Sequence, residues 1–144
     1  MLIDTHSHIY LSEFDEDRTE VINRAKAAGV SHIILPNVDK ETLESMWALE
    51  ATEPKYFSAT IGLHPTSVDA TYKQELEWVK RELGRRPYCA IGEVGIDLYW
   101  DKTFREEQIE ALSTIVYRDQ AMREGREVVE ILKDSLPRQM FAVK

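Results

Sequence analysis

The stretch SHIILP, residues 31–36, is a short apolar run that stops at a proline. A run of this kind is typical of a buried strand, and strands that read as continuous apolar runs belong mostly to parallel sheets. The same character recurs in YCAI, residues 88–91. The sequence therefore predicts an α/β protein with a parallel central sheet.

Strand-like and helix-like patterns alternate on both sides of this run. Strands are expected in residues 2–5, 31–36, 55–65 and 88–96, and helices in residues 17–28, 39–50 and 72–83. Each unit takes about 30 residues, which is the usual size of a strand–helix–strand unit. With no linker or low-complexity segment, this order indicates a single domain over residues 1–144.

The last third of the chain has two interpretations. Residues 104–112 have a helical pattern, and STIVY (113–117) is rich in β-branched residues and could form a short strand. Alternatively, one long helix runs from 104 to 134. The periodicity of apolar residues does not decide between these alternatives.

Charge and composition limit the classes of function. The chain has 26 acidic and 18 basic residues, a net charge of −8, so it is a poor general binder of nucleic acid. A phosphodiester substrate would need local positive charge from a few basic residues or from metal ions. No apolar run approaches the roughly 18 residues of a membrane span. The single cysteine, Cys89, excludes an internal disulfide and favours a reducing compartment, the cytoplasm.

Two histidines lie two residues apart directly after the first expected strand. Alternate residues of a strand share a face, so His6 and His8 are expected to point the same way. A neutral imidazole is the commonest side-chain ligand of transition metals. The pair therefore suggests a metal site, and the alternative is two partly exposed histidines in a loop.

Polar residues also follow two later strands. His64 ends the third expected strand and Glu93 ends the fourth. Because ligands of parallel α/β folds bind outside the carboxyl ends of the strands, these residues and the His-x-His pair are expected to share one polar or metal site. The alternatives are a turn histidine and a solvated loop carboxylate. His32 begins a strand at the opposite rim and is expected to be structural.

Three motifs together resemble one family. DTHSH (4–8), IGLHP (61–65) and AIGEVGIDLYW (90–100) resemble the TatD-type metal-dependent deoxyribonucleases of the amidohydrolase-like superfamily. The resemblance implies a (β/α)8 TIM-type barrel with its site at the C-terminal rim, and hydrolysis of phosphodiester bonds in DNA with divalent metal ions. A complete barrel takes about 250 residues. We therefore expect an incomplete barrel of about the first four to five βα units, whose open sheet edges favour self-association.

The resemblance also implies roles for four residues. His6 and His8 would hold a metal, Glu93 would bridge two metals or support the water nucleophile, and His64 would contact the substrate phosphate or order the site. One or two divalent ions, Mg, Mn or Zn, are implied. The family takes further histidine and aspartate ligands from later strands. The nearest match, TIVYRD (114–119), has Val116 where a histidine is expected.

Three functions follow from this comparison of motifs. The chain could be a DNA phosphodiesterase, a catalytically inactive remnant that binds at most one metal, or a metal hydrolase that acts on another ester or amide. The three motifs favour the first function. The missing ligands favour the second.

Overall fold

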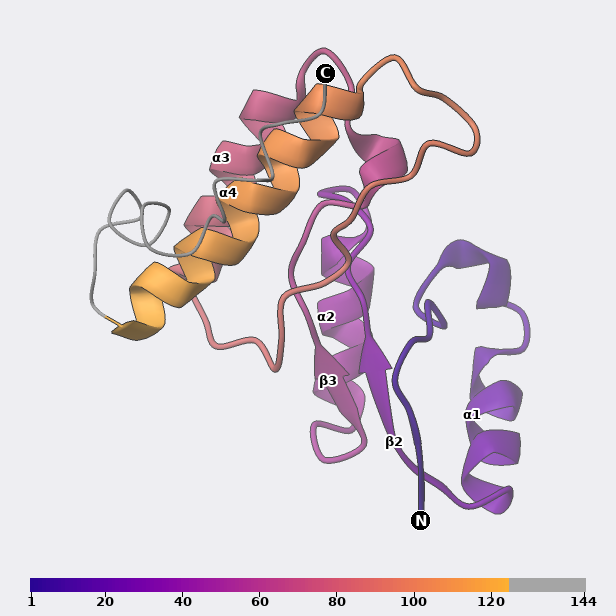
Figure 1. Ribbon diagram of the computed structural model, residues 1–144. Helices are drawn as coiled ribbons and strands as arrows, with labels where there is room; N and C mark the ends of the chain where they lie inside the picture. The colour runs from indigo at the N-terminus through magenta and orange to yellow at the C-terminus, as the bar shows by residue number, and fades with distance from the viewer. Residues whose placement is uncertain (125–144) are drawn as a thin grey trace.

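The computed structural model describes residues 1–124 and shows a parallel sheet with helices packed around it (Figure 1). The strands lie in the order β1-β2-β3. They are β1 (Leu2–Asp4), β2 (Val30–Leu35) and β3 (Phe57–Ala59), and the helices are η1 (Ser12–Phe14), α1 (Arg18–Ala27), α2 (Leu43–Thr52), η2 (Pro65–Ser67), α3 (Tyr72–Leu83) and α4 (Arg105–Glu124). This alternation confirms the predicted α/β fold.

The fourth expected strand, 88–96, is much shorter in the structure than the pattern predicts. Only Ile91 forms a parallel bridge, to Ile61 beyond the end of β3. The amide of Cys89 donates to the Ala59 carbonyl at 3.1 Å and the amide of Gly92 donates to the Ile61 carbonyl at 2.9 Å. The segment therefore has the predicted neighbour and direction, but the chain leaves the ladder after Gly92.

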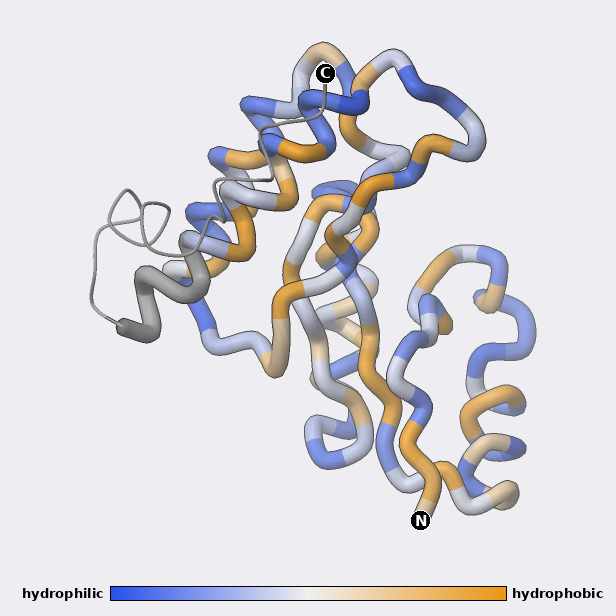
Figure 2. The backbone as a smooth tube through the Cα atoms, viewed as in Figure 1, coloured by the Kyte–Doolittle hydropathy of each residue, from blue (hydrophilic) through white to orange (hydrophobic). Residues whose placement is uncertain are grey.

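Apolar residues follow β2 through the centre of the fold (Figure 2). Ile33 and Leu35 are buried, whereas Ile34 between them is only partly buried. The apolar run predicted a strand that is buried on both of its faces, whereas β2 is fully buried on one face only. The side of Ile34 lines an open hollow of about 400 Å³ that also contains His6 and Glu93.

The structure of α4 decides, as far as residue 124, between the short strand and the long helix predicted for the last third of the chain. Residues 105–124 form one helix, α4, so a short strand at STIVY is wrong. α4 packs along α3, with Ala111 and Ile115 buried one helical turn apart, and the Tyr72 hydroxyl donates to Glu110 at 2.8 Å. Residues 125–134, where the long-helix interpretation continues, lie outside the described residues.

One edge of the sheet has no partner in residues 1–124. β1 pairs only with β2, and Leu2 and Ile3 are 57% and 50% exposed. This arrangement is that of an incomplete barrel. No helix of the described residues is long and apolar enough to cross a membrane.

Candidate metal centre

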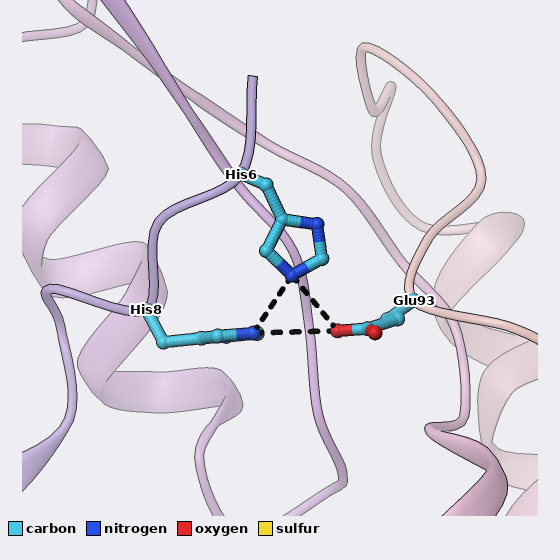
Figure 3. A group of neighbouring side chains, drawn as sticks. All are labelled: His6, His8 and Glu93. Atoms are coloured by element: carbon cyan, nitrogen blue, oxygen red, sulfur yellow. Dashed lines mark hydrogen bonds and ion pairs between the residues drawn. The ribbon is translucent and has the colours of Figure 1, made fainter. Parts of the chain in front are cut away.

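Three potential ligand atoms meet at the carboxyl ends of the strands (Figure 3). His6 Nε2 and His8 Nε2 lie 3.1 Å apart, and they lie 3.2 and 3.3 Å from Glu93 Oε2. The two histidines follow β1, whereas Glu93 follows the segment that bridges to Ile61. Parallel strands bring their ends to one rim, so residues 85 positions apart in the sequence become neighbours. We call these three residues the His–His–Glu group.

The geometry of this group fits a small cation. Glu93 Oε2 is buried and has no hydrogen-bond donor in the part of the chain that the structure describes. Nitrogen and carboxylate ligands lie about 2.0–2.2 Å from a bound zinc ion, which brings neighbouring ligand atoms to roughly 3–3.5 Å from one another. The three observed separations lie in that range. A cation between them would be within reach of all three atoms.

His64 lies beside the group but contacts the other carboxylate oxygen. Its Nε2 atom lies 3.3 Å from Glu93 Oε1. Its Nδ1 atom accepts a hydrogen bond from the Thr66 backbone amide at 3.2 Å and lies 2.6 Å from the Thr66 hydroxyl. The structure therefore brings all four site residues expected from the sequence together, with His64 next to the Oε1 atom of Glu93 rather than Oε2.

The backbone of Glu93 is held from the ends of two neighbouring strands. The Asn37 carbonyl accepts the Glu93 amide at 2.9 Å, and the Asn37 amide donates to the Gly92 carbonyl at 3.3 Å. The Thr60 hydroxyl also bonds to the Gly92 carbonyl. At Gly62 an added Cβ would lie 2.4 Å from the Glu93 carbonyl oxygen. The sequence did not identify these residues as part of the site, although Asn37 directly follows the apolar run 31–36 from which the fold was predicted.

His8 has a second contact outside the group. Its Nδ1 atom lies 3.1 Å from the hydroxyl of Tyr10, which in turn donates to the Pro36 carbonyl. Partial burial lowers the pKa of His8 below its usual value, against the opposing attraction of the Glu93 carboxylate. The neutral imidazole, which is the form that binds metals, is therefore favoured.

His32 is not part of the group. Its two ring nitrogens lie 3.2 Å from the Lys55 carbonyl and 2.9 Å from the Ser58 hydroxyl. The residue ties β2 to the start of β3, in agreement with the structural role expected from the sequence.

Comparisons with known proteins agree with these motifs. Residues 3–118 match the family model described as TatD related DNase, and residues 104–144 are similar to a second model, GTP-binding protein LepA C-terminus. An uncharacterized metal-dependent hydrolase, YabD of Bacillus subtilis, is 36% identical over 121 residues, which are 83% of this chain and 45% of that protein. The 3'-5' ssDNA/RNA exonuclease TatD of Dickeya dadantii is 30% identical over 112 residues, 78% of this chain and 42% of that protein.

A solved structure also has the same fold. The crystal structure of YjjV, a TatD homologue from Escherichia coli K12, superposes with a TM-score of 0.73 at 32% identity and covers 87% of this chain and 48% of that chain. The present chain thus spans less than half the length of these relatives. The part it spans contains the whole His–His–Glu group.

Proposed function

The chain belongs to the TatD-related DNase family, and from that premise we propose that its His–His–Glu group binds a divalent cation and hydrolyses phosphodiester bonds in DNA. The observation that carries the proposal is the meeting of three potential ligand atoms, Nε2 of His6, Nε2 of His8 and the buried Oε2 of Glu93, within 3.3 Å of one another. A cation held there would polarise a phosphodiester and lower the pKa of a water molecule. It would also supply the local positive charge that a chain of net charge −8 needs near a phosphate backbone.

The two oxygens of Glu93 have different neighbours, and this difference supports a different role for each of them. Oε2 faces the two imidazoles and is the oxygen that would hold the cation. Oε1 faces His64 at 3.3 Å and, beside a hydrogen bond from His64, keeps a lone pair that can accept the proton of an attacking water. His64 then lies where it can donate a hydrogen bond to the substrate phosphate or to Oε1.

The number of ions follows from the number of ligands. Within residues 1–124 the His–His–Glu group provides three ligand atoms for one centre. We therefore expect one divalent ion, Mg, Mn or Zn, per chain. Nucleic acid is the substrate class because relatives of this family are named ssDNA/RNA exonucleases. The cytoplasm is the expected compartment, because Cys89 is the single cysteine.

A second candidate function is a chain that binds one cation and catalyses nothing. It is favoured by the same count of ligands, because the clamp of two ions used by many nucleases needs more ligands than the described residues provide. Both candidate functions require that the chain binds a metal ion, and only the first requires that it hydrolyses a substrate.

The test is hydrolysis by the purified chain with added Mn²⁺ or Mg²⁺. The substrates are an end-labelled single-stranded oligonucleotide and bis(p-nitrophenyl) phosphate, which has no base. We expect hydrolysis that is abolished by EDTA and falls by roughly 100-fold or more in Glu93→Gln. Glu44→Gln, which removes an exposed carboxylate of α2, is the matched control and should leave the rate unchanged.

Two other results would contradict the proposed hydrolysis of phosphodiester bonds. Binding of one ion per chain without hydrolysis of either substrate would establish the inert candidate. Absence of bound metal after reconstitution, measured by elemental analysis, would remove the metal centre and both functions with it.

A further inference from the structure

We infer that hydrogen bonds outside the metal centre fix His8 and His64 in opposite tautomers, so that His8 presents a lone pair to a cation and His64 presents a proton to Glu93. The role of each tautomer rests on the function proposed above. The tautomers themselves follow from contacts in the described residues and can be measured without metal.

The tautomer of His8 follows from a chain of two hydrogen bonds. The Pro36 carbonyl can only accept, so the Tyr10 hydroxyl must use its single proton for that bond. The phenol oxygen can then only accept from the His8 ring, whose Nδ1 atom lies 3.1 Å away. His8 Nδ1 therefore carries the ring proton. Nε2, which faces Glu93 Oε2 at 3.3 Å, carries the free lone pair.

The surroundings of Tyr10 make this chain of bonds stable. Its side chain is only 1% exposed, so water does not compete for the hydroxyl. A partner that holds the outer ring nitrogen of a metal-binding histidine fixes the ring orientation and raises its affinity for the metal. Tyr10 is thus a positioning residue for His8.

The tautomer of His64 is set in the opposite sense. The backbone amide of Thr66 can only donate, and its acceptor is His64 Nδ1 at 3.2 Å. His64 Nδ1 therefore has no proton, and Nε2 carries it. That Nε2–H faces Glu93 Oε1 at 3.3 Å. His64 is consequently a hydrogen-bond donor in the site rather than a fourth ligand of the His–His–Glu group.

His6 provides an internal comparison. Its side chain is 54% exposed, and its Nδ1 atom has no hydrogen-bond partner among the residues that the structure describes. In the described residues no hydrogen bond from outside the His–His–Glu group sets the tautomer of His6, whereas such bonds fix those of His8 and His64 before metal binds.

The test is a long-range ¹H–¹⁵N correlation spectrum of the metal-free, ¹⁵N-labelled protein at about pH 8, where histidines are neutral. We expect His8 as the Nδ1–H tautomer and His64 as the Nε2–H tautomer in the wild-type chain. In Tyr10→Phe the His8 signals should move toward the Nε2–H form that free histidine prefers, and those of His64 should not move. Zn²⁺ or Co²⁺ affinity of this variant should fall by roughly 10–100-fold.

Tyr56→Phe is the matched control. Tyr56 precedes β3, is 8% exposed, and its buried hydroxyl has no hydrogen-bond partner in the described residues. This variant removes the same atom from a phenol that does not touch the metal centre. Both the tautomers and the metal affinity should remain those of the wild type.

The outcomes separate this inference from the proposed function. A wild-type spectrum with His8 as Nε2–H, or with His64 as Nδ1–H, would overturn the inference, and this measurement holds even if Tyr10→Phe does not fold. Unchanged metal affinity in a folded Tyr10→Phe would also overturn it, since His8 would then need no support. The expected tautomers in a chain that binds no metal would confirm the assignment and refute the metal centre.

Discussion

Gly62 lies directly against the backbone of Glu93, so that a Cβ atom at residue 62 would stand 2.4 Å from the Glu93 carbonyl oxygen and 2.8 Å from its amide nitrogen. Contacts under 3.0 Å to backbone atoms cannot be relieved by rotating a side chain. The absence of a side chain at Gly62 therefore determines where Glu93 can lie. The IGLHP motif therefore contacts the backbone of the residue that supplies the carboxylate of the proposed metal centre.

We expect Gly62→Ala to displace Glu93 and weaken metal binding by roughly 10-fold or more, the range seen when support around metal ligands is lost. Isothermal titration with Zn²⁺ measures the affinity, and circular dichroism shows whether the fold persists. Gly84→Ala is the control, because the nearest atom to its added Cβ is 3.4 Å away at the end of α3. Equal affinities of the two variants would show that the close approach does not position the carboxylate.

A second prediction concerns Thr60, which is 3% exposed. Its hydroxyl bonds to the Gly92 carbonyl and lies 3.4 Å from the Asn37 amide. Thr60→Val keeps the shape but removes the hydroxyl, so we expect a loss of about 1–3 kcal/mol in the free energy of unfolding. Urea denaturation measures it.

The control for this variant is Thr19→Val, on the exposed surface of α1. Its free energy of unfolding should stay within about 0.5 kcal/mol of the wild type. A similar loss in both variants would mean that valine itself, rather than the missing hydrogen bond, is responsible.

Much of the site was predictable because it depends on where strands end. Each of His6, His8, His64 and Glu93 follows a segment that reads as a strand, and a parallel sheet brings such ends to one rim. Tyr10 was not predictable in the same way. Its role depends on a bond to Pro36, 26 residues away, and no local pattern encodes that contact.

The length of α4 could not be predicted for a related reason. STIVY has β-branched residues that suit a strand, yet the segment is helical because Ala111 and Ile115 are buried in a helix that packs on α3. Tertiary packing thus overrides local preference. The TatD related DNase model matches only as far as residue 118, and residues 104–144 match a second family model.

A third prediction uses the lowered pKa of His8. Because burial is the main cause, the metal-free protein should protonate His8 at a pH below the usual 6.5, which an NMR titration measures. As the pH falls, His8 is protonated in the unfolded chain at a higher pH than in the folded protein. Stability should therefore be unaffected by His8 above about pH 6.5 and should decrease as the pH falls below it. A His8 midpoint above 6.5 would contradict the burial seen here.

The pH dependence of unfolding gives an independent check. In His8→Gln the loss of stability between about pH 7 and pH 5 should be smaller than in the wild type, because the residue that resists protonation is gone. The same loss in both proteins would assign it to other groups.

A fourth prediction concerns the contact that joins α2 to the segment after α3. Glu50 accepts from the Ala59 amide at 2.7 Å and pairs with Arg86, whose guanidinium lies 5.5 Å from the Trp47 ring centre and 5.1 Å from that of Tyr88. The Glu50 side chain is 16% exposed. Arg86→Ala would leave this carboxylate without its cation, so we expect a loss of about 1–3 kcal/mol in urea denaturation.

Arg24→Ala is the matched control for the loss of an arginine. Arg24 pairs with Glu20 on the surface of α1, and its side chain is 59% exposed. Exposed pairs of this kind contribute less than about 0.5 kcal/mol. If both variants lost the same small amount, the Arg86 contact would be no stronger than a surface ion pair.

The last prediction concerns the open edge of the sheet. Within residues 1–124, β1 has β2 on one side only, and Ile3 on it is 50% exposed. Backbone donors and acceptors on its other side have no partner in these residues and are available for pairing. We expect concentration-dependent self-association of the chain in size-exclusion chromatography with light scattering. Ile3→Lys should suppress it, because a lysine on an edge strand opposes further pairing. Ile96→Lys places the same charge at a 47% exposed position outside the strands and should not. Equal suppression by both lysines would indicate general apolar association, and a wild-type monomer at all concentrations would refute pairing through β1.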